Sequence, residues 1–272
     1  MKQFFTFLLV STLCACSHQP STLTILHTND THSQVLPKDN GMGGYARRMG
    51  LITRERAIDS QLVLCDAGDF CQGSTFFNFF RGRVEVDALN RMGYDVITLG
   101  NHEFDNGVDT LATILKDAHF QVVISNYDVS GSALEGIVKP YTIIRRNGLK
   151  IGVFGIGCSP VGLIDQKRFE PLTYLPAYET AQKMADLLKE RKHCDVVICL
   201  SHQGTYASSP GDCNDVEMVQ QTRNIDLVIG GHTHNVFEDV RVKNKDGKEV
   251  LLVQSGKAGE RIGKITLKMG TF

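Results

Sequence analysis

The 272-residue sequence contains no tryptophan and only 7 prolines, and it has no surplus of either charge. Its 29 lysines and arginines are matched by 30 aspartates and glutamates, so the formal net charge is -1. The bulk basic field that attracts nucleic acid is therefore missing, and we expect no nucleic-acid partner. Low-complexity tracts and repeats of 20–50 residues are also missing, which excludes a disordered chain and a solenoid.

A hydrophobic run of membrane-spanning length is missing as well. The longest uncharged apolar stretch covers residues 4–15, which is shorter than the roughly 20 residues that a transmembrane helix needs. Lys2 precedes this stretch and Leu13-Cys14-Ala15-Cys16 ends it, a pattern typical of a secretory signal and similar to a bacterial lipobox. A plain signal peptide cut elsewhere, or a buried helix, is the alternative.

From this pattern we predict a lipoprotein signal peptide over residues 1–15, lipidation of Cys16 and a polar tether over residues 16–22. The lipid would then attach the protein to a membrane without a transmembrane helix. The expected location is the bacterial cell envelope, in the periplasm or at the outer membrane.

The cysteines beyond Cys14 and Cys16 form no C-x-x-C pair, which excludes a zinc ribbon and a thioredoxin-type motif. An even number of cysteines in an exported protein allows disulfides. Against this, Cys65 and Cys199 lie in apolar runs, where a buried free thiol is the simpler interpretation. The sequence leaves the choice open for Cys65, Cys71, Cys158, Cys194, Cys199 and Cys213.

Apolar, β-branched runs alternate along the chain with segments of helical spacing. The expected helices cover residues 45–56, 84–92, 108–118 and 178–192. The expected strands cover residues 23–28, 62–65, 96–99, 121–125, 151–156, 196–200, 227–229 and 264–268. Asn147-Gly148 and Asp246-Gly247 predict two hairpins. The alternation favours an α/β fold with a largely parallel core, and the lack of a Pro- or Gly-rich linker favours one domain.

Polar clusters follow five of these strands. The carboxyl ends of strands in open α/β sheets share one edge, so we expect the clusters to converge there. Each cluster alone is weak evidence, because a lone Asp-x-His or Gly-Asp is usually a turn, but five together are poorly explained by coincidence. The residues concerned are Asp30, His32, Asp69, Asn101, His102, His202, His232 and His234.

This set combines carboxylate, imidazole and amide donors without thiolate, which suits Zn, Mn or Fe better than Mg or Ca. Eight candidates are too many for one tetrahedral site, but they fit two ions that share a carboxylate. Two ions about 3.5–4 Å apart can bind a bridging hydroxide and neutralise a phosphoryl group during in-line attack. The donor set therefore points to hydrolysis of phosphate esters with two divalent metal ions as cofactors.

The chain resembles the calcineurin-like metallophosphoesterases in full motif order. The matching motifs are Asp30-x-His32, Gly68-Asp69-x-x-Gln72-Gly73, Gly100-Asn101-His102-Glu103, His202 and Gly231-His232-x-His234. Three local versions are similar to the 5′-nucleotidase branch, namely His27-Thr-Asn-Asp30, Gly43-Gly44-Tyr45-Ala46-Arg47 and Asn101-His102-Glu103-Phe104-Asp105. The resemblance implies a four-layer α/β/β/α sandwich with two central mixed sheets, formed by residues 23–272.

The resemblance also implies roles for single residues. The first ion would be held by Asp30, His32, Asp69 and His234. Asp69 would bridge to a second ion, completed by Asn101, His202 and His232. His102 would not bind metal but would stabilise the phosphoryl transition state or protonate the leaving oxygen, oriented by Asp105.

Secreted 5′-nucleotidases of this branch usually carry a C-terminal domain that grips the nucleotide, and the sequence ends at Phe272 where the metallophosphoesterase pattern closes. We therefore expect an exported, lipid-anchored phosphohydrolase that cleaves phosphate monoesters, most plausibly nucleotides. A separate chain could supply the C-terminal nucleotide-binding domain. The alternatives are a phosphodiesterase or broad phosphatase for 2′,3′-cyclic nucleotides or other small esters, and a non-catalytic subunit that depends on a partner. Intact His102 and Asp105 argue against the last.

Three other features are expected to be structural. The glycines of residues 152–157 lack the order of a dinucleotide loop and should let a strand pack closely or bend. His27 falls inside the first strand and is expected to be a satisfied core histidine rather than a ligand. Arg47 and Arg48 could meet a phosphate, although exposure on a helix is the simpler expectation.

Overall fold

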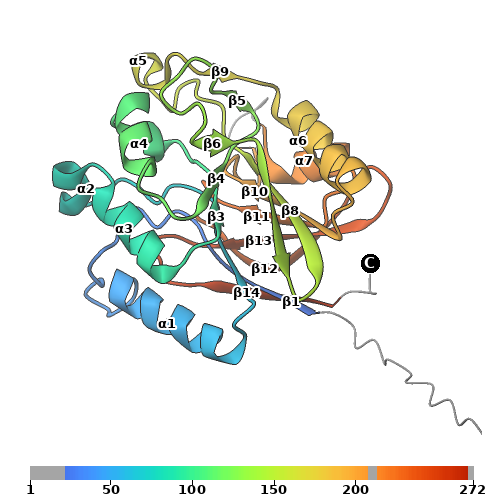
Figure 1. Cartoon of the computed structure of the whole chain (residues 1–272), viewed down its shortest axis with the longest axis horizontal. Coiled ribbons are helices and arrows are strands. Elements are labelled where there is room, and N and C mark those ends of the chain that lie inside the picture. The colour runs from blue at the N-terminus through green and yellow to red at the C-terminus, as the bar shows by residue number, and fades with distance from the viewer. Residues whose placement is uncertain (1–21, 208–212, 269–272) are drawn as a thin grey trace, which may run out of the picture.

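The computed structural model describes residues 22–207 and 213–268. Two six-stranded sheets face each other at the centre, and helices cover their outer faces (Figure 1). This arrangement confirms the predicted α/β sandwich with two central mixed sheets. The predicted signal peptide, the lipidation of Cys16 and all of the tether except Thr22 lie outside the described residues.

The first sheet has the order β14-β1-β2-β3-β4-β6. Its strands are β1 (Thr22–Thr28), β2 (Val63–Asp66), β3 (Val96–Ile97), β4 (Gln121–Val123), β6 (Val138–Lys139) and β14 (Gly263–Lys268). Neighbouring strands are parallel except β14, which pairs antiparallel with β1. The carboxyl ends of β1, β2 and β3 therefore lie at one edge.

The second sheet has the order β12-β13-β11-β10-β8-β7. Its strands are β7 (Tyr141–Arg146), β8 (Leu149–Ile156), β10 (Val196–Ser201), β11 (Leu227–Gly230), β12 (Val236–Lys243) and β13 (Glu249–Ser255). The two predicted hairpins form the antiparallel pairs β7–β8 and β12–β13, while the four inner strands run parallel. A separate pair joins β5 (Tyr127–Asp128) to β9 (Thr173–Tyr174).

All four expected helices are present, and shorter ones accompany them. The helices are α1 (Tyr45–Ile58), α2 (Thr75–Phe80), α3 (Arg83–Met92), η1 (His102–Phe104), α4 (Val108–Leu115), α5 (Gln166–Phe169), α6 (Ala177–Asp186), η2 (Leu187–Arg191) and α7 (Asp215–Gln221). The single helix expected over residues 178–192 ends in a π-helical turn, η2. No helix of the described residues is long and apolar enough to cross a membrane.

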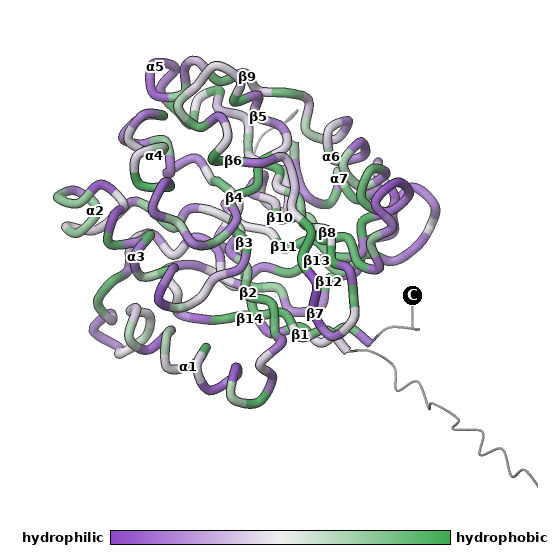
Figure 2. Tube along the Cα trace, in the orientation of Figure 1, coloured by the Kyte–Doolittle hydropathy of each residue, from purple (hydrophilic) through white to green (hydrophobic). Residues whose placement is uncertain are grey.

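Three apolar clusters hold the layers together. One packs α1, α3 and α4 against the first sheet, and another packs α6 and α7 against the second. The cluster between the sheets contains Ile25 and Val63 from the first sheet and Val153 and Ile198 from the second, all fully buried. Figure 2 accordingly shows the central strands mostly green and the outer helices and loops richer in purple.

The six described cysteines form no disulfide with one another. Five of them are buried and Cys213 is half-buried. Burial raises the pKa of the Cys65 and Cys199 thiols well above its ordinary value. The interpretation of Cys65 and Cys199 as buried free thiols is therefore confirmed, and the other described cysteines are free as well.

The glycines of β8 allow the two sheets to touch, as the sequence predicted. A Cβ atom on Gly155 would lie 2.2 Å from the carbonyl oxygen of Val123 and 2.3 Å from Oγ1 of Thr98. Both of these neighbours belong to the side of the first sheet, and Ser125 also donates its N–H to the carbonyl of Gly155 at 2.8 Å. Only a residue without a side chain permits this approach.

We expect Gly155→Ala to lower the free energy of unfolding by about 3 kcal/mol or more, because backbone rather than a flexible side chain blocks the added methyl group. Gly50→Ala is the matched control. Gly50 lies exposed inside α1, and a Cβ there meets nothing within 4 Å. The control should stabilise the protein by about 0.5–1 kcal/mol. Urea unfolding of both variants tests the prediction, and equal stability of the two would contradict it.

Candidate metal centre

The five polar loops converge at the shared carboxyl edge of the two sheets. The loops after β1, β2 and β3 carry Asp30 with His32, Asp69, and Asn101 with His102. The loops after β10 and β11 carry His202, His232 and His234. Their side chains form two clusters of possible metal donors, with the donor atoms of each cluster within 4.8 Å of one another. The clusters are Asp30, His32 and His234, and Asp69, His202 and His232.

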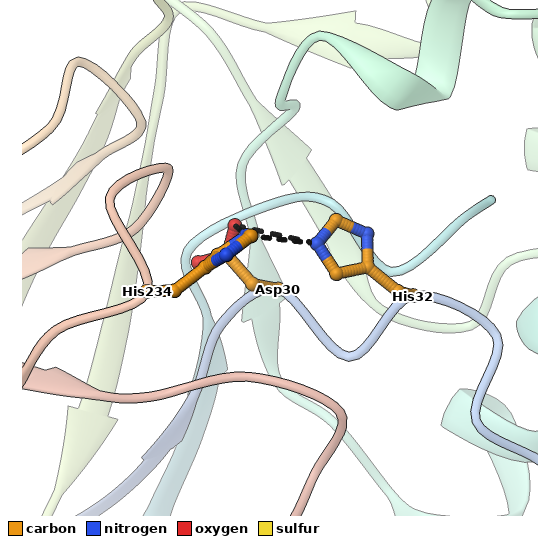
Figure 3. Close-up of side chains that lie close together, drawn as sticks. All are labelled: Asp30, His32 and His234. Atoms are coloured by element: carbon orange, nitrogen blue, oxygen red, sulfur yellow. Dashed lines mark hydrogen bonds and ion pairs between the residues drawn. The ribbon is translucent and has the colours of Figure 1, made fainter. Parts of the chain in front are cut away.

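The first cluster brings two imidazole rings against one carboxylate, as Figure 3 shows. Nε2 of His234 lies 3.3 Å from Oδ1 of Asp30. Nε2 of His32 lies 3.0 Å from Nε2 of His234 and 3.8 Å from the same Asp30 oxygen. Asp30 is fully buried, while the two histidines reach the surface, so the cluster opens to solvent on the histidine side.

The second cluster lies deeper. Nε2 of His202 is 3.1 Å from Oδ2 of Asp69, and both side chains are almost completely buried. Asn101 adjoins the cluster, since its Oδ1 is 3.1 Å from Nδ1 of His232. The two clusters are also close to each other, because Nε2 of His202 lies 3.9 Å from Oδ1 of Asp30. All seven predicted ligands are therefore gathered in one place, and their individual roles stay predictions.

The hydrogen bonds of His202 show that these donors fit a metal ion. Its Nδ1 lies 2.7 Å from the carbonyl oxygen of Ala67, which can only accept, so Nδ1 carries the proton. In the neutral ring, Nε2 is then an acceptor that faces the Asp69 carboxylate. It is buried and has no hydrogen-bond partner. Two acceptors this close repel each other unless a proton or a metal cation lies between them, so these two atoms can share either one.

The protonation states of the free site are compatible with metal binding. Burial, reinforced by the charge of His202, lowers the pKa of His232, and burial also lowers the pKa of His32. Burial alone would raise the pKa of Asp69, but His202 beside it brings the value well below its ordinary range. Metal binding requires neutral imidazoles and ionised carboxylates. His32, His232 and Asp69 are shifted toward these forms. Burial alone would lower the pKa of His202, but the charge of Asp69 raises it well above its ordinary value, so His202 releases a proton when a metal ion binds.

The backbone at the site is strained. Five of the candidate ligands are not glycine yet adopt positive φ angles, which cost about 1–2 kcal/mol each. They are Asp30 (50°), His32 (41°), Asp69 (57°), His232 (70°) and His234 (57°). Such strain gathers at functional sites, where the surrounding contacts over-determine the conformation.

His102 and Asp105 form the predicted pair. Nδ1 of His102 lies 3.0 Å from Oδ2 of Asp105, and both side chains are about 30% exposed. Burial on its own would lower the pKa of His102, but the hydrogen bond to Asp105 and the charge of Asp69 outweigh it and raise the pKa. The ring centroids of His102 and His32 are 5.5 Å apart. Asp105 thus favours the protonated form of this imidazole, which lies beside the first cluster.

Two buried side chains that hold the ligand loops had no assigned role in the sequence. Glu103 accepts N–H bonds from Asp69 (2.9 Å), Cys71 (3.0 Å) and Gly100 (2.6 Å), and so joins the loops after β2 and β3. Asn29 donates to Oδ2 of Asp30 at 2.6 Å and fixes its carboxylate. Both residues lie inside the recognised motifs, but their partners are distant in sequence.

Comparison with known proteins identifies the family. The family model of the calcineurin-like phosphoesterases matches residues 23–236 of the chain. The chain belongs to the calcineurin-like phosphoesterase family. It is 33% identical to a snake venom 5′-nucleotidase from Gloydius brevicauda over 90% of this chain and 45% of that protein.

Solved structures of the family show the same fold. A 5′-nucleotidase precursor from Thermus thermophilus superposes with a TM-score of 0.80 at 31% identity, over 91% of this chain and 51% of that one. The NAD nucleotidase of Haemophilus influenzae gives 0.81 at 25% identity, over 93% and 48%. The chain thus spans about half the length of these relatives. Family membership implies divalent metal ions, and the two His/Asp clusters are the place for them.

We predict that Asp69→Asn removes most of the metal, because Asp69 lies in the deeper cluster and also next to the first. The wild-type protein should retain about two ions per chain after gel filtration, and the variant fewer than one. Elemental analysis by mass spectrometry measures both. Asp87→Asn, an exposed carboxylate on α3 that pairs with Arg91, is the control and should keep both ions. Full metal content in Asp69→Asn would refute the bridging role.

Proposed function

We propose that the chain hydrolyses phosphate monoesters, with 5′-nucleotides as its main substrates. The observation that carries this proposal is the pair of adjacent His/Asp clusters with the His102–Asp105 pair at their open side. The names of the relatives support it, since 5′-nucleotidases from snake venom and from Thermus thermophilus are both about one third identical to the chain.

When bound, two divalent ions supply a hydroxide nucleophile and positive charge for the phosphoryl oxygens. The chain contributes Asp30, His32 and His234 on one side, and Asp69, His202, His232 and Asn101 on the other. Because Asp105 occupies Nδ1 of His102, Nε2 is the ring nitrogen left to donate to a phosphoryl or leaving-group oxygen. The hydrogen bond to Asp105 also raises the pKa of this ring and so favours the protonated form that donation requires.

We expect His102→Ala to lower kcat by about 10²–10⁴-fold with little loss of metal, because His102 acts on the substrate and is not a ligand. Phosphate release from 5′-AMP by the manganese-loaded or zinc-loaded protein measures the effect, and elemental analysis verifies the metal content. His119→Ala, an exposed histidine away from the site, is the control. An unchanged kcat in His102→Ala would exclude the proposed role.

A second candidate substrate class is favoured by one relative. A trifunctional nucleotide phosphoesterase from Bacillus subtilis is 28% identical over 89% of this chain and 18% of that protein. A phosphodiesterase or broad phosphatase should turn over a 2′,3′-cyclic nucleotide or an aryl phosphate as well as AMP. Turnover of the aryl ester alone would support a separate chain that supplies nucleotide contacts. A protein that binds both ions but turns over none of these substrates would support a non-catalytic subunit.

Location in the cell envelope through a lipid on Cys16 is part of the proposal. The signal-like residues 1–15 and the lipobox-like ending support it. In a bacterial host, Cys16→Ala should move the protein from the membrane fraction to the soluble fraction, because one lipid-modified residue provides the attachment. Cys213→Ala, a half-buried cysteine of the folded domain, is the control. Membrane association that persists in Cys16→Ala would rule out the anchor.

A further inference from the structure

Positive charge gathers at the amino end of the second sheet, the end opposite the metal centre. The inner strands β8, β10, β11 and β13 run parallel, so the segments that precede them share one edge. Residues 145–150, 189–195, 223–226 and 243–249 contain ten lysines and arginines against five aspartates and glutamates. Their formal net charge is +5 in a chain whose total is -1. These four segments form the basic edge.

Most cations of the basic edge are exposed and unpaired. Two of its five carboxylates are already held within the fold, since Asp226 pairs with Lys189 at 3.0 Å and Glu190 lies 3.8 Å from Arg223. Six further cations are exposed and form no ion pair with any residue in the described parts of the chain, namely Arg145, Arg191, Lys192, Lys243, Lys245 and Lys248. An anionic partner therefore meets these six charges without displacing a carboxylate.

The chain enters the fold beside the basic edge. Asn147, in the turn of the β7–β8 hairpin, donates its side-chain N–H to the carbonyl of Thr22 at 3.0 Å, and Figure 1 shows the start of β1 next to this hairpin. Thr22 also pairs in register with Lys268 at the end of β14. Thr22 follows Cys16 by six residues, which span at most about 22 Å. A lipid on Cys16 would therefore keep a membrane close to the basic edge.

The basic edge is wide enough to lie flat on a bilayer. It crosses the second sheet from the β12–β13 hairpin to the β7–β8 hairpin, and six strands about 4.8 Å apart span about 24 Å. The metal centre lies at the other end of these strands. Because β8 has eight residues, the two ends are about 25 Å apart. A bilayer against the basic edge would leave the metal centre open to the aqueous side.

The composition of the basic edge favours lipid headgroups over nucleic acid. Surfaces that bind single-stranded nucleic acid combine basic side chains with aromatic rings on which the bases stack. The four segments contain no phenylalanine, tyrosine or tryptophan. Dispersed lysines and arginines next to a membrane attachment are instead typical of segments that bind anionic lipids.

We propose that the basic edge docks on the anionic lipid headgroups of the membrane to which Cys16 is attached. The inference rests on the proposed function, because it takes the lipid on Cys16 from there. The lipid holds the protein at the membrane, and the exposed cations orient it, since an anionic lipid surface attracts basic side chains within a Debye length of about 10 Å. The metal centre then faces away from the bilayer.

The test maps the exposure of lysines on vesicles. The lipid-modified full chain is added to vesicles of phosphatidylcholine alone, or of phosphatidylcholine and phosphatidylglycerol in equal parts. Acetylation of each lysine by acetic anhydride is then measured by mass spectrometry. Lys192, Lys245 and Lys248 should react about fivefold more slowly on the anionic vesicles, because lysines near an anionic surface are held against it.

Two exposed lysines at the metal end are internal controls. Lys257 follows the carboxyl end of β13, and Lys167 lies on α5 next to Arg168, which donates to the carbonyl of Asp105. Both should react equally on the two kinds of vesicle. Salt at about 1 M, where the Debye length is about 3 Å, should abolish the protection of the basic edge. Equal acetylation of its lysines on both vesicles would overturn the proposal, whether or not soluble polyphosphate protects them.

A pair of double variants tests the charge itself. Lys245→Glu with Lys248→Glu lowers the formal net charge of the basic edge from +5 to +1 and should remove the protection of Lys192. Lys167→Glu with Lys257→Glu makes the same change in net charge at the metal end and should preserve it. All four positions are exposed, and thermal unfolding verifies that both variants are folded. Protection of Lys192 that persists in the first variant would contradict the proposal.

Failure of the lipid anchor gives a different result, and none of these measurements involves catalysis. A chain without the lipid does not float with phosphatidylcholine vesicles. In that case, flotation of the unmodified full chain with the mixed vesicles is measured at low salt. Binding that Lys245→Glu with Lys248→Glu weakens by about fivefold or more would support the basic edge independently of the anchor. No binding of the wild-type chain would reject it.

Discussion

The packing of one sheet on the other is the constraint on which the site depends. Asp30, His32 and Asp69 follow strands of the first sheet, whereas His202, His232 and His234 follow strands of the second. Each cluster therefore takes donors from both sheets. The dry layer between the sheets, with the close contact at Gly155, fixes their separation and hence the spacing of the donors. A shift of either sheet would disturb both clusters together.

Each ligand loop contains strained backbone angles, and hydrogen bonds between the loops hold them in place. Asp30 donates its N–H to the carbonyl of Gly68, and His32 donates to the carbonyl of Asp69, so the loop after β1 is bonded to the loop after β2. Glu103 extends this connection to the loop after β3. Positive φ angles persist because no loop can relax without breaking bonds to its neighbour. The bonds between the loops thus help to position the donors.

Hydrophobic period and strand ends are local signals, so the sequence predicts the α/β class and most of the long elements. The sandwich with two central sheets was predicted by the family resemblance. The short helices α2, α5 and α7 were not predicted, since four to seven residues give too little periodicity, and side-chain caps such as Ser74 on Phe77 define α2 instead. The motifs predict which ligands converge. The expectation of exposure on the helix is correct for Arg47 but wrong for Arg48. Arg48 is buried, one turn from buried Ile52 and stacked on Tyr45, because spacing shows a helix face but not its surroundings. His27 is buried, as expected, but it is not satisfied, since its Nδ1 has no hydrogen-bond partner among the described residues.

Most of the described cysteines are shielded from reagents in the solvent. Cys65, Cys71, Cys194 and Cys199 lie inside the apolar clusters, whereas buried Cys158 lies beside Asn101. Burial raises the pKa of all five of these thiols. The thiolate is the reactive form, so these groups resist both oxidation and alkylation. Among the six described cysteines, half-buried Cys213, just before α7, is the natural position for a thiol-reactive label.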